Sequence, residues 1–284
     1  MNASHLEDYG RDSCQQFDLE KYLRIAGATR PDIFDWSDPG PRLDDDALFC
    51  LGYMMDIESH TIVYLREILS TSIVEDASIT AFLSCWAYEE FFHSQLLKRV
   101  LQSQGVAIDD KRFAELRRAR PADHAIMKFA RLLSRTVRHF PAVHMTWGAI
   151  NELSTLTGYR ALSEKTHHPL LGAVLAQIIK DERRHFSFYF NQARLRLQPR
   201  TARILTCLAV RNFWSPVGSS VRGDAATRQL CAYLFGGENG RHLLAQHDAL
   251  IARLPGLRWF DLATRYCCGA SAVTSPIAQT HQAV

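Results

Sequence analysis

Two copies of a Glu-x-x-His motif are the residues of this chain best suited to do chemistry. The first copy is Glu90–His93 and the second is Glu182–His185. An acidic residue stands directly before each Glu, Glu89 in the first copy and Asp181 in the second. Positions i and i+3 share one face of an α-helix. Each motif can therefore aim one carboxylate and one imidazole at a single point.

A lone Glu precedes each motif. Glu58 lies about thirty residues before Glu90, and Glu152 lies about thirty before Glu182, which suits two helical hairpins with their ligands level, ~20 Å from each turn. Four such helices in a bundle would place four carboxylates and two imidazoles around one pocket, the ligand set of a dinuclear iron or manganese site. The predicted metal ligands are Glu58, Glu90, His93, Glu152, Glu182 and His185.

A plainer interpretation makes these residues four surface carboxylates and two capping or solvated histidines. The neighbouring sequence favours the metal site, because both motifs stand among apolar residues, for example Trp86 and Leu96 around the first and Ile178 and Phe186 around the second. Burying unpaired charges there would be costly, and metal coordination is a usual compensation.

Composition bounds the class of protein. The chain has 284 residues, of which 47% are hydrophobic, enough for one large soluble domain. A net charge of +3 does not point to a nucleic-acid partner, and no run of about eighteen apolar residues predicts a membrane span. The seven cysteines include no Cys-x-x-Cys pair, which predicts reduced thiols. The first twenty residues are polar and do not resemble a secretory signal, which predicts a cytoplasmic protein.

Breaker and cap residues predict an all-α fold, since no segment alternates apolar and polar residues. We expect an irregular lead-in, a helical bundle, further helices packed on it and a disordered tail, over residues 1–42, 43–198, 199–268 and 269–284. Long helices are expected over about 45–70, 77–104, 141–165 and 169–197. Further helices are expected after Pro121 and over about 201–212, 224–235 and 240–253. The aromatic segment 213–218 either packs over the bundle or covers a substrate entrance.

The segment Trp86–His93 resembles the Trp-x-x-Glu-Glu-x-x-His segment of the soluble acyl-carrier-protein desaturases, in the ferritin-like di-iron superfamily. Asp181–His185 is similar to that family's Asp-Glu-x-Arg-His segment. Pro141, ahead of Glu152, and Thr155 after it also fit. The resemblance covers roughly residues 45–198, and the family's C-terminal part is not recognisable.

The resemblance implies a ferritin-like four-helix bundle with a di-metal core and extra C-terminal helices. Glu58 and Glu152 would be terminal ligands, Glu90 and Glu182 would bridge two irons, and each His would bind one iron. Glu89 and Asp181 would accept hydrogen bonds from the outer nitrogens of the ligand histidines. The Thr155 hydroxyl would relay a proton, and Arg184 would neutralise one of the outer acids. Trp86 and His144 could line the substrate pocket.

Each of these roles has a structural alternative. Thr155 could bond its own helix backbone, Arg184 could lie on the surface, and His144 could be a buried core histidine. Two basic clusters are either solvated helix ends or a docking surface for an acidic carrier protein or a ferredoxin-type electron donor. These clusters are Lys111, Arg112, Arg117, Arg118 and Arg120, and Arg194, Arg196, Arg200 and Arg203.

The expected function is oxygen-dependent oxidation of an unactivated C–H bond by a homodimeric enzyme. Desaturation of an acyl chain is the preferred choice of reaction. Hydroxylation, N-oxygenation or aldehyde cleavage on the same bundle are alternatives, although Ile178 stands where some N-oxygenases add a histidine. Two further classes are a ferritin-like metal-storage protein and a metal-free helical interaction protein.

Overall fold

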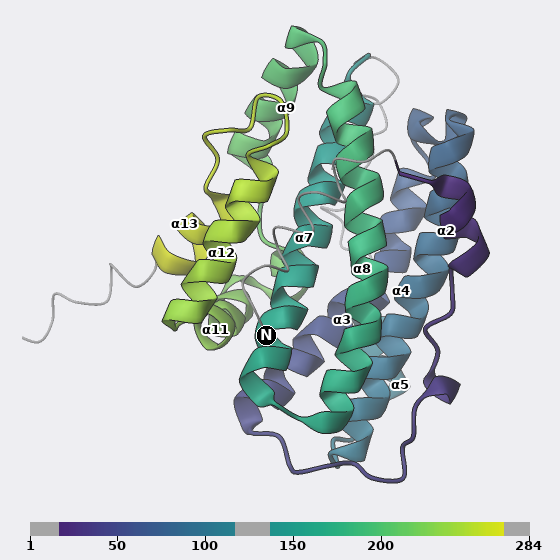
Figure 1. Cartoon of the computed structure of the whole chain (residues 1–284), viewed down its shortest axis with the longest axis vertical. Coiled ribbons are helices and arrows are strands. Elements are labelled where there is room, and N and C mark those ends of the chain that lie inside the picture. Colours follow the sequence, from purple (N-terminus) through teal and green to yellow (C-terminus); the bar gives the residue numbers. More distant parts are fainter. Residues whose placement is uncertain (1–16, 117–136, 270–284) are drawn as a thin grey trace, which may run out of the picture.

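The computed structural model describes residues 17–116 and 137–269. Over these residues the chain is all-α, as the sequence predicts, and contains no strand. Four long helices run side by side through the molecule (Figure 1). Helix pairs α3/α4 and α7/α8 make the most extensive contacts, and α4 also contacts α8. The four helices are α3 (Asp45–Ile68), α4 (Ala77–Ser103), α7 (Phe140–Thr166) and α8 (Pro169–Arg196).

Local sequence explains where these helices begin and end. The Asp76 side chain accepts hydrogen bonds from the backbone N–H groups of Ser78 and Ile79 and so caps α4. Gly105, with φ +81°, follows the end of the same helix, in a left-handed conformation that glycine adopts without strain. Pro169 is the first residue of α8, where a missing backbone N–H is tolerated.

The described part of the lead-in differs from expectation, because it contains helical structure. Predicted irregular over 1–42, it contains helix α2 (Leu19–Ile25) and the 3-10 turn η1 (Pro31–Ile33). The Asp18 side chain caps α2 by accepting from the Lys21 N–H. The helix packs against α4 and buries Tyr22. After α4, the connection carries α5 (Asp110–Leu116), while the helix predicted from Pro121 and the tail beyond residue 269 lie outside the described residues.

The C-terminal helices gather beside α7, on the side of the bundle away from α2 (Figure 1). Besides the three predicted helices, this part includes two short helices that were not predicted from the sequence. The five are α9 (Arg200–Phe213), α10 (Ser219–Arg222), α11 (Asp224–Phe235), α12 (Glu238–Ile251) and α13 (Leu262–Gly269).

The aromatic segment after α9 packs on the bundle. Tyr53 of α3 donates its hydroxyl to the Val217 carbonyl at 2.8 Å, and Trp214 packs against the core. Phe213 is 75% exposed and takes no part in this packing.

Two contacts fix the long helices relative to their surroundings. Gly148 of α7 lies against the Tyr189 ring of α8, where an added Cβ would come within 2.3 Å of a ring carbon. Asp56, fully buried on α3, pairs with Arg112 of α5 at 2.6 Å and with Arg222 of α10 at 2.8 Å.

Among the described helices, none is both long and apolar enough to cross a membrane.

Candidate metal centre

The six predicted ligands come together from all four long helices. Glu58 lies on α3, Glu90 and His93 on α4, Glu152 on α7, and Glu182 and His185 on α8. Their ligand atoms form two groups, within each of which they lie within 4.8 Å of one another. The first group is Glu58, Glu90, His93 and Glu182, and the second is Glu90, Glu152, Glu182 and His185. All six residues are buried, and both groups could hold a metal ion.

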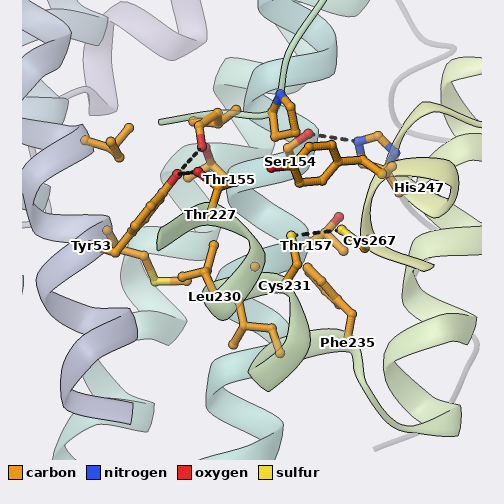
Figure 2. A pocket seen from close by; sticks show the side chains of 18 of the residues that line it. Tyr53, Ser154, Thr155, Thr157, Thr227, Leu230, Cys231, Phe235, His247 and Cys267 are labelled. Atoms are coloured by element: carbon orange, nitrogen blue, oxygen red, sulfur yellow. Dashed lines mark hydrogen bonds between the residues drawn. The ribbon is translucent and has the colours of Figure 1, made fainter. Parts of the chain in front are cut away.

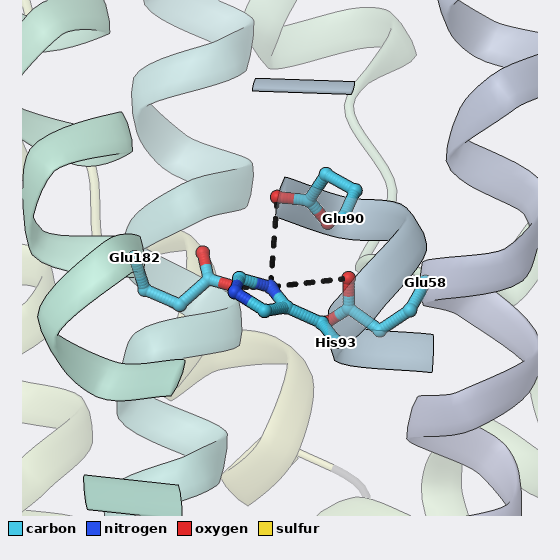
Figure 3. Close-up of side chains that lie close together, drawn as sticks. All are labelled: Glu58, Glu90, His93 and Glu182. Atoms are coloured by element: carbon cyan, nitrogen blue, oxygen red, sulfur yellow. Dashed lines mark ion pairs between the residues drawn. The ribbon is translucent and has the colours of Figure 1, made fainter. Parts of the chain in front are cut away.

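His93 belongs to the first group and points its Nδ1 atom at three carboxylates. Nδ1 lies 3.2 Å from Glu182 Oε1 and 4.0 Å from both Glu58 Oε2 and Glu90 Oε1. Figure 3 shows this ring between the three glutamates, which approach from α3, α4 and α8.

His185 holds the corresponding place in the second group. Its Nδ1 lies 3.1 Å from Glu90 Oε1, 3.5 Å from Glu182 Oε2 and 3.6 Å from Glu152 Oε2. Glu90 and Glu182 therefore belong to both groups, and each of the other four residues belongs to one.

Five of the inward atoms lack a hydrogen-bond partner within the described part of the chain. Among the described residues, the buried unpartnered atoms include Glu90 Oε1, both Glu182 oxygens, and Nδ1 of His93 and of His185. Buried polar atoms are normally paired, and unpaired ones cost free energy. Their convergence from four helices is the arrangement expected of atoms that bind a cation, so the residues present fit a pair of divalent metal ions.

The outer nitrogens of both histidines meet the acids that precede the opposite motif. His93 Nε2 lies 3.2 Å from Asp181 Oδ2, and His185 Nε2 lies 2.8 Å from Glu89 Oε2. Arg184 joins the two acids: its guanidinium donates to Glu89 Oε1 at 3.2 Å and to Asp181 Oδ1. A carboxylate on the outer nitrogen fixes the ring orientation and raises the basicity of a metal-binding imidazole.

Two tyrosines at the site were not expected from the sequence. Tyr22 of α2 donates to Glu89 Oε2 at 2.8 Å, and the Gly27 N–H donates to Glu89 Oε1 at 2.9 Å. Tyr159 of α7 donates its hydroxyl to Glu58 Oε1. Tyr159 follows Glu152 by two helical turns, which was a usable signal, whereas nothing in the local sequence of Tyr22 points to Glu89.

Burial and mutual pairing shift the pKa values of the ligands. Burial raises the pKa of Glu152 to about 8 and raises the pKa values of Glu58 and Glu90 too. Burial acts on Glu182 as well, but the two imidazoles outweigh it and lower the pKa of this carboxyl to about 2.

Burial disfavours the charged form of both imidazoles, but the surrounding carboxylates raise their pKa values well above the ordinary value. Without a cation the cluster thus retains protons that a metal ion would displace.

An apolar pocket adjoins the first group, and its volume of about 730 Å³ includes open solvent at the mouth. Glu58, Thr155 and Tyr159 line it beside residues of the C-terminal helices and the 214–217 segment. Figure 2 shows Thr155 in the pocket together with Leu230 and His247 of the C-terminal helices. The Thr155 hydroxyl has no hydrogen-bond partner among the described residues, unlike Ser154 and Thr157, which bond the carbonyl four residues earlier. In the structure, the Thr155 hydroxyl therefore does not bond the backbone of its own helix, which was the alternative to a proton-relay role.

Trp86 and His144, the two predicted pocket residues, do not line this pocket. They lie in an aromatic cluster with Tyr64 and Tyr189, in which the His144 ring stacks on Tyr64 at 5.7 Å between centroids. Burial lowers the pKa of His144 to about 4, so this ring is neutral at pH 7. The core-histidine alternative describes His144 better.

The basic clusters are partly engaged within the chain. Arg112 pairs with Asp56, and Arg196 pairs with Asp76 at 2.7 Å. Arg117, Arg118 and Arg120 lie outside the described residues. Ion pairs within the chain thus engage Arg112 and Arg196, and docking of an acidic partner stays a prediction.

Comparison of the chain with protein-family models, with curated proteins and with solved structures gave no match. The resemblance to acyl-carrier-protein desaturases therefore rests on the sequence motifs alone.

Proposed function

We propose that this protein is an oxygen-dependent, non-haem di-iron oxidase of the ferritin-like type that acts on an unactivated C–H bond. One observation carries the proposal. Two buried ligand groups share Glu90 and Glu182, and five inward atoms of Glu90, Glu182, His93 and His185 have no hydrogen-bond partner among the described residues. Carboxylates and imidazoles suit iron or manganese better than the thiolate-rich sites typical of copper(I) and many structural zinc ions. An iron pair bound there would supply electrons to dioxygen and the oxidising power to remove hydrogen from carbon.

The residues divide the work around this centre. His93 and His185 would each hold one ion, Glu90 and Glu182, which belong to both groups, would help to hold both, and Glu58 and Glu152 would complete the ligand set. The outer acids and Arg184 hold the imidazoles in orientation. The Tyr159 hydroxyl holds one oxygen of Glu58. The Thr155 hydroxyl, at the pocket wall, would hold or pass a proton at its Oγ1 atom.

The pocket favours an enzyme over a metal store. Glu58 is the only acidic residue among those that line it, and most of the others are apolar. A path that carries many cations needs repeated oxygen ligands, whereas an apolar pocket beside a reactive centre suits an organic substrate. Desaturation of an acyl chain is our first choice of reaction, and hydroxylation or another oxygenation of a small molecule is the alternative.

Metal content and oxygen use test the proposal together. The purified protein should contain iron, about two ions per chain if both groups fill. After anaerobic reduction, an oxygen pulse with acyl-carrier-protein-bound and free acyl substrates should yield an alkene or an alcohol in amounts that follow the iron content. Protein with no affinity for iron or manganese would end the proposal. Iron uptake far beyond two ions per chain, with assembly into a cage seen by light scattering, would favour storage.

The remaining expectations follow from this proposal. A ferredoxin-type protein would supply electrons and dioxygen would be the co-substrate, while a homodimer would be the working assembly. Size-exclusion chromatography with light scattering tests the last of these.

A further inference from the structure

Helix α9 turns its larger apolar side chains outward. The residues that it buries are Ala202, Thr206 and Val210, which are of small or moderate size. On the opposite face, Ile204 is 51% exposed and Leu208 is 55% exposed. A surface helix normally does the reverse and packs its largest apolar residues against the core. The outer face of α9 is therefore suited to contact something outside the described part of the chain.

Two aromatic side chains extend this apolar face. Phe213, the last residue of α9, is 75% exposed, and Trp259 is 79% exposed. The loop that carries Trp259 lies against α9, because Cys207 donates its thiol to the Gly256 carbonyl at 3.0 Å. Figure 1 shows α9 and this loop together on the side of the bundle away from α2.

Arginines border these apolar residues. Arg200, Ile204, Leu208 and Arg211 recur at intervals of three or four residues and so share one face of the helix. Arg200 and Arg211 are exposed, and neither has an ion-pair partner among the described residues. The sequence around them supplies no counter-charge, since residues 183–223 contain eight arginines and no Asp or Glu. We call the whole set the α9 surface: Arg200, Ile204, Leu208, Arg211, Phe213 and Trp259.

We propose that the α9 surface docks on an anionic lipid bilayer. A basic amphipathic helix with Leu, Phe or Trp on its apolar side is the kind of element that lies in the plane of a membrane interface. The arginines pair with phosphate headgroups, and the apolar side chains reach the edge of the acyl region. Arg258 stacks its guanidinium over the Trp259 ring at 4.2 Å and adds a charge at the same place.

The shape of the α9 surface favours a bilayer over a protein partner. Phe213 and Trp259 are the two most exposed large apolar side chains of the described residues, so each protrudes from the surface. A protein partner would need a matching pocket for each ring, because protein interfaces pack as closely as protein interiors. Lipid molecules part around a protruding ring without a preformed pocket. The docking site is independent of the proposed metal centre, and loss of metal leaves it unchanged.

Vesicle sedimentation with the full chain tests the proposal. One set of vesicles contains phosphatidylglycerol and phosphatidylcholine in equal parts, and the other contains phosphatidylcholine alone. We expect the protein to sediment with the first set and not with the second. Added salt should release it, because salt screens the attraction between arginines and headgroups.

Charge variants locate the binding on α9. The double variant Arg200→Gln and Arg211→Gln should weaken binding to the anionic vesicles at least about ten-fold, since each arginine near such a surface contributes about five-fold. The double variant Arg24→Gln and Arg42→Gln makes the same charge change at exposed residues outside the α9 surface. It should bind like the wild type, and circular dichroism checks that both variants are folded.

Apolar variants test whether side chains enter the bilayer. Phe213→Gln should weaken binding about ten-fold, because its ring is no longer removed from water. Ile25→Gln, at a residue of α2 that is 41% exposed, is the control. Trp259 is the exposed one of five tryptophans, which all lie in the described part of the chain. Its emission should shift to the blue with anionic vesicles and be quenched by brominated acyl chains. Trp259→Phe should lose this response and still sediment.

Three results would overturn the proposal. The first is a protein that stays in solution with the anionic vesicles at low salt, and the second is an equal loss of binding in the two arginine double variants. The third is binding without any change in Trp259 emission or any effect of Phe213→Gln, which would mean adsorption by charge alone. If an acidic carrier protein binds the α9 surface and vesicles do not, this surface belongs to a protein partner and the proposal is wrong.

Discussion

His185 donates its outer ring N–H to Glu89 across the bundle, with 2.8 Å between Nε2 and Oε2. A carboxylate can only accept, so this contact keeps a proton on Nε2 and directs Nδ1 to the centre of the site. His93 does the same with Asp181. Each histidine is thus oriented by the acid that precedes the opposite motif, and the two motifs lock each other in place.

Replacing a glutamate that belongs to both ligand groups should remove both metal ions. We expect Glu182→Gln to lower bound iron to near zero, because the amide keeps the shape but loses the charge that faces both histidines. Glu90→Ala and Glu182→Ala should do the same. Metal analysis by plasma mass spectrometry measures this, with Glu115→Ala, an exposed residue of α5, as control. Equal iron in all these variants would reject the ligand assignment.

Arg184 should matter through the acids that it joins. Arg184→Met removes the cation shared by Glu89 and Asp181, and we expect metal affinity to fall about 10-fold to 100-fold, as for other supports of ligating histidines. Competition with a chelating dye gives the affinity. Arg183→Met makes the same charge change at an exposed neighbour and should leave it unaltered. A loss of the same size in both variants would point to net charge instead.

Tyr22 tests whether α2 is part of the site. Tyr22→Phe removes the hydroxyl that donates to Glu89 and leaves the ring packed. We expect a loss of about 1 kcal/mol in the free energy of unfolding and weaker metal binding. Tyr88→Phe, at a tyrosine that is 46% exposed, is the control. Urea denaturation and the dye competition report the two effects, and unchanged values in both would detach α2 from the centre.

Thr155 should act in oxygen use and not in metal binding. Thr155→Val keeps the shape and removes the unpaired hydroxyl at the pocket wall. We expect unchanged iron content and less product per dioxygen consumed, measured with an oxygen electrode and product analysis. Thr146→Val is a fitting control, since that hydroxyl bonds the Ala142 carbonyl and the residue is outside the pocket lining. Full coupling in Thr155→Val would remove its role.

Asp56 should contribute mainly to stability. Asp56→Asn leaves Arg112 and Arg222 without their shared buried carboxylate. We expect a loss of about 2 kcal/mol, less than for a fully buried pair because both guanidinium groups are partly exposed. Asp224→Asn, in the exposed pair with Arg228, should not measurably shift the urea midpoint. An unchanged urea midpoint in Asp56→Asn would show that the two ion pairs of Asp56 do not stabilise the packing of α5 and α10 on α3.

The sequence predicted the helices and the inward-facing groups well, because both depend on local spacing. Helix caps and breakers lie within a few residues of the ends they set, as Asp76 and Gly105 do for α4. The short helices α2, α10 and α13 were not predicted, since helices of eight residues or fewer carry little periodicity. Trp86 and His144 were assigned to the pocket from motif position and helix phase, but neighbouring rings decide which cavity a side chain meets.

By itself, the sequence determined that the chain is helical and that Glu58, Glu152 and the two motifs could converge, because the 3.6-residue repeat fixes which side chains share a face. Only the tertiary structure decided that Tyr22 supports Glu89 and Tyr159 supports Glu58. It also decided that the C-terminal helices build an apolar pocket beside Glu58. These contacts join segments 67 and 101 residues apart, and the packing of helix on helix sets them, not local spacing.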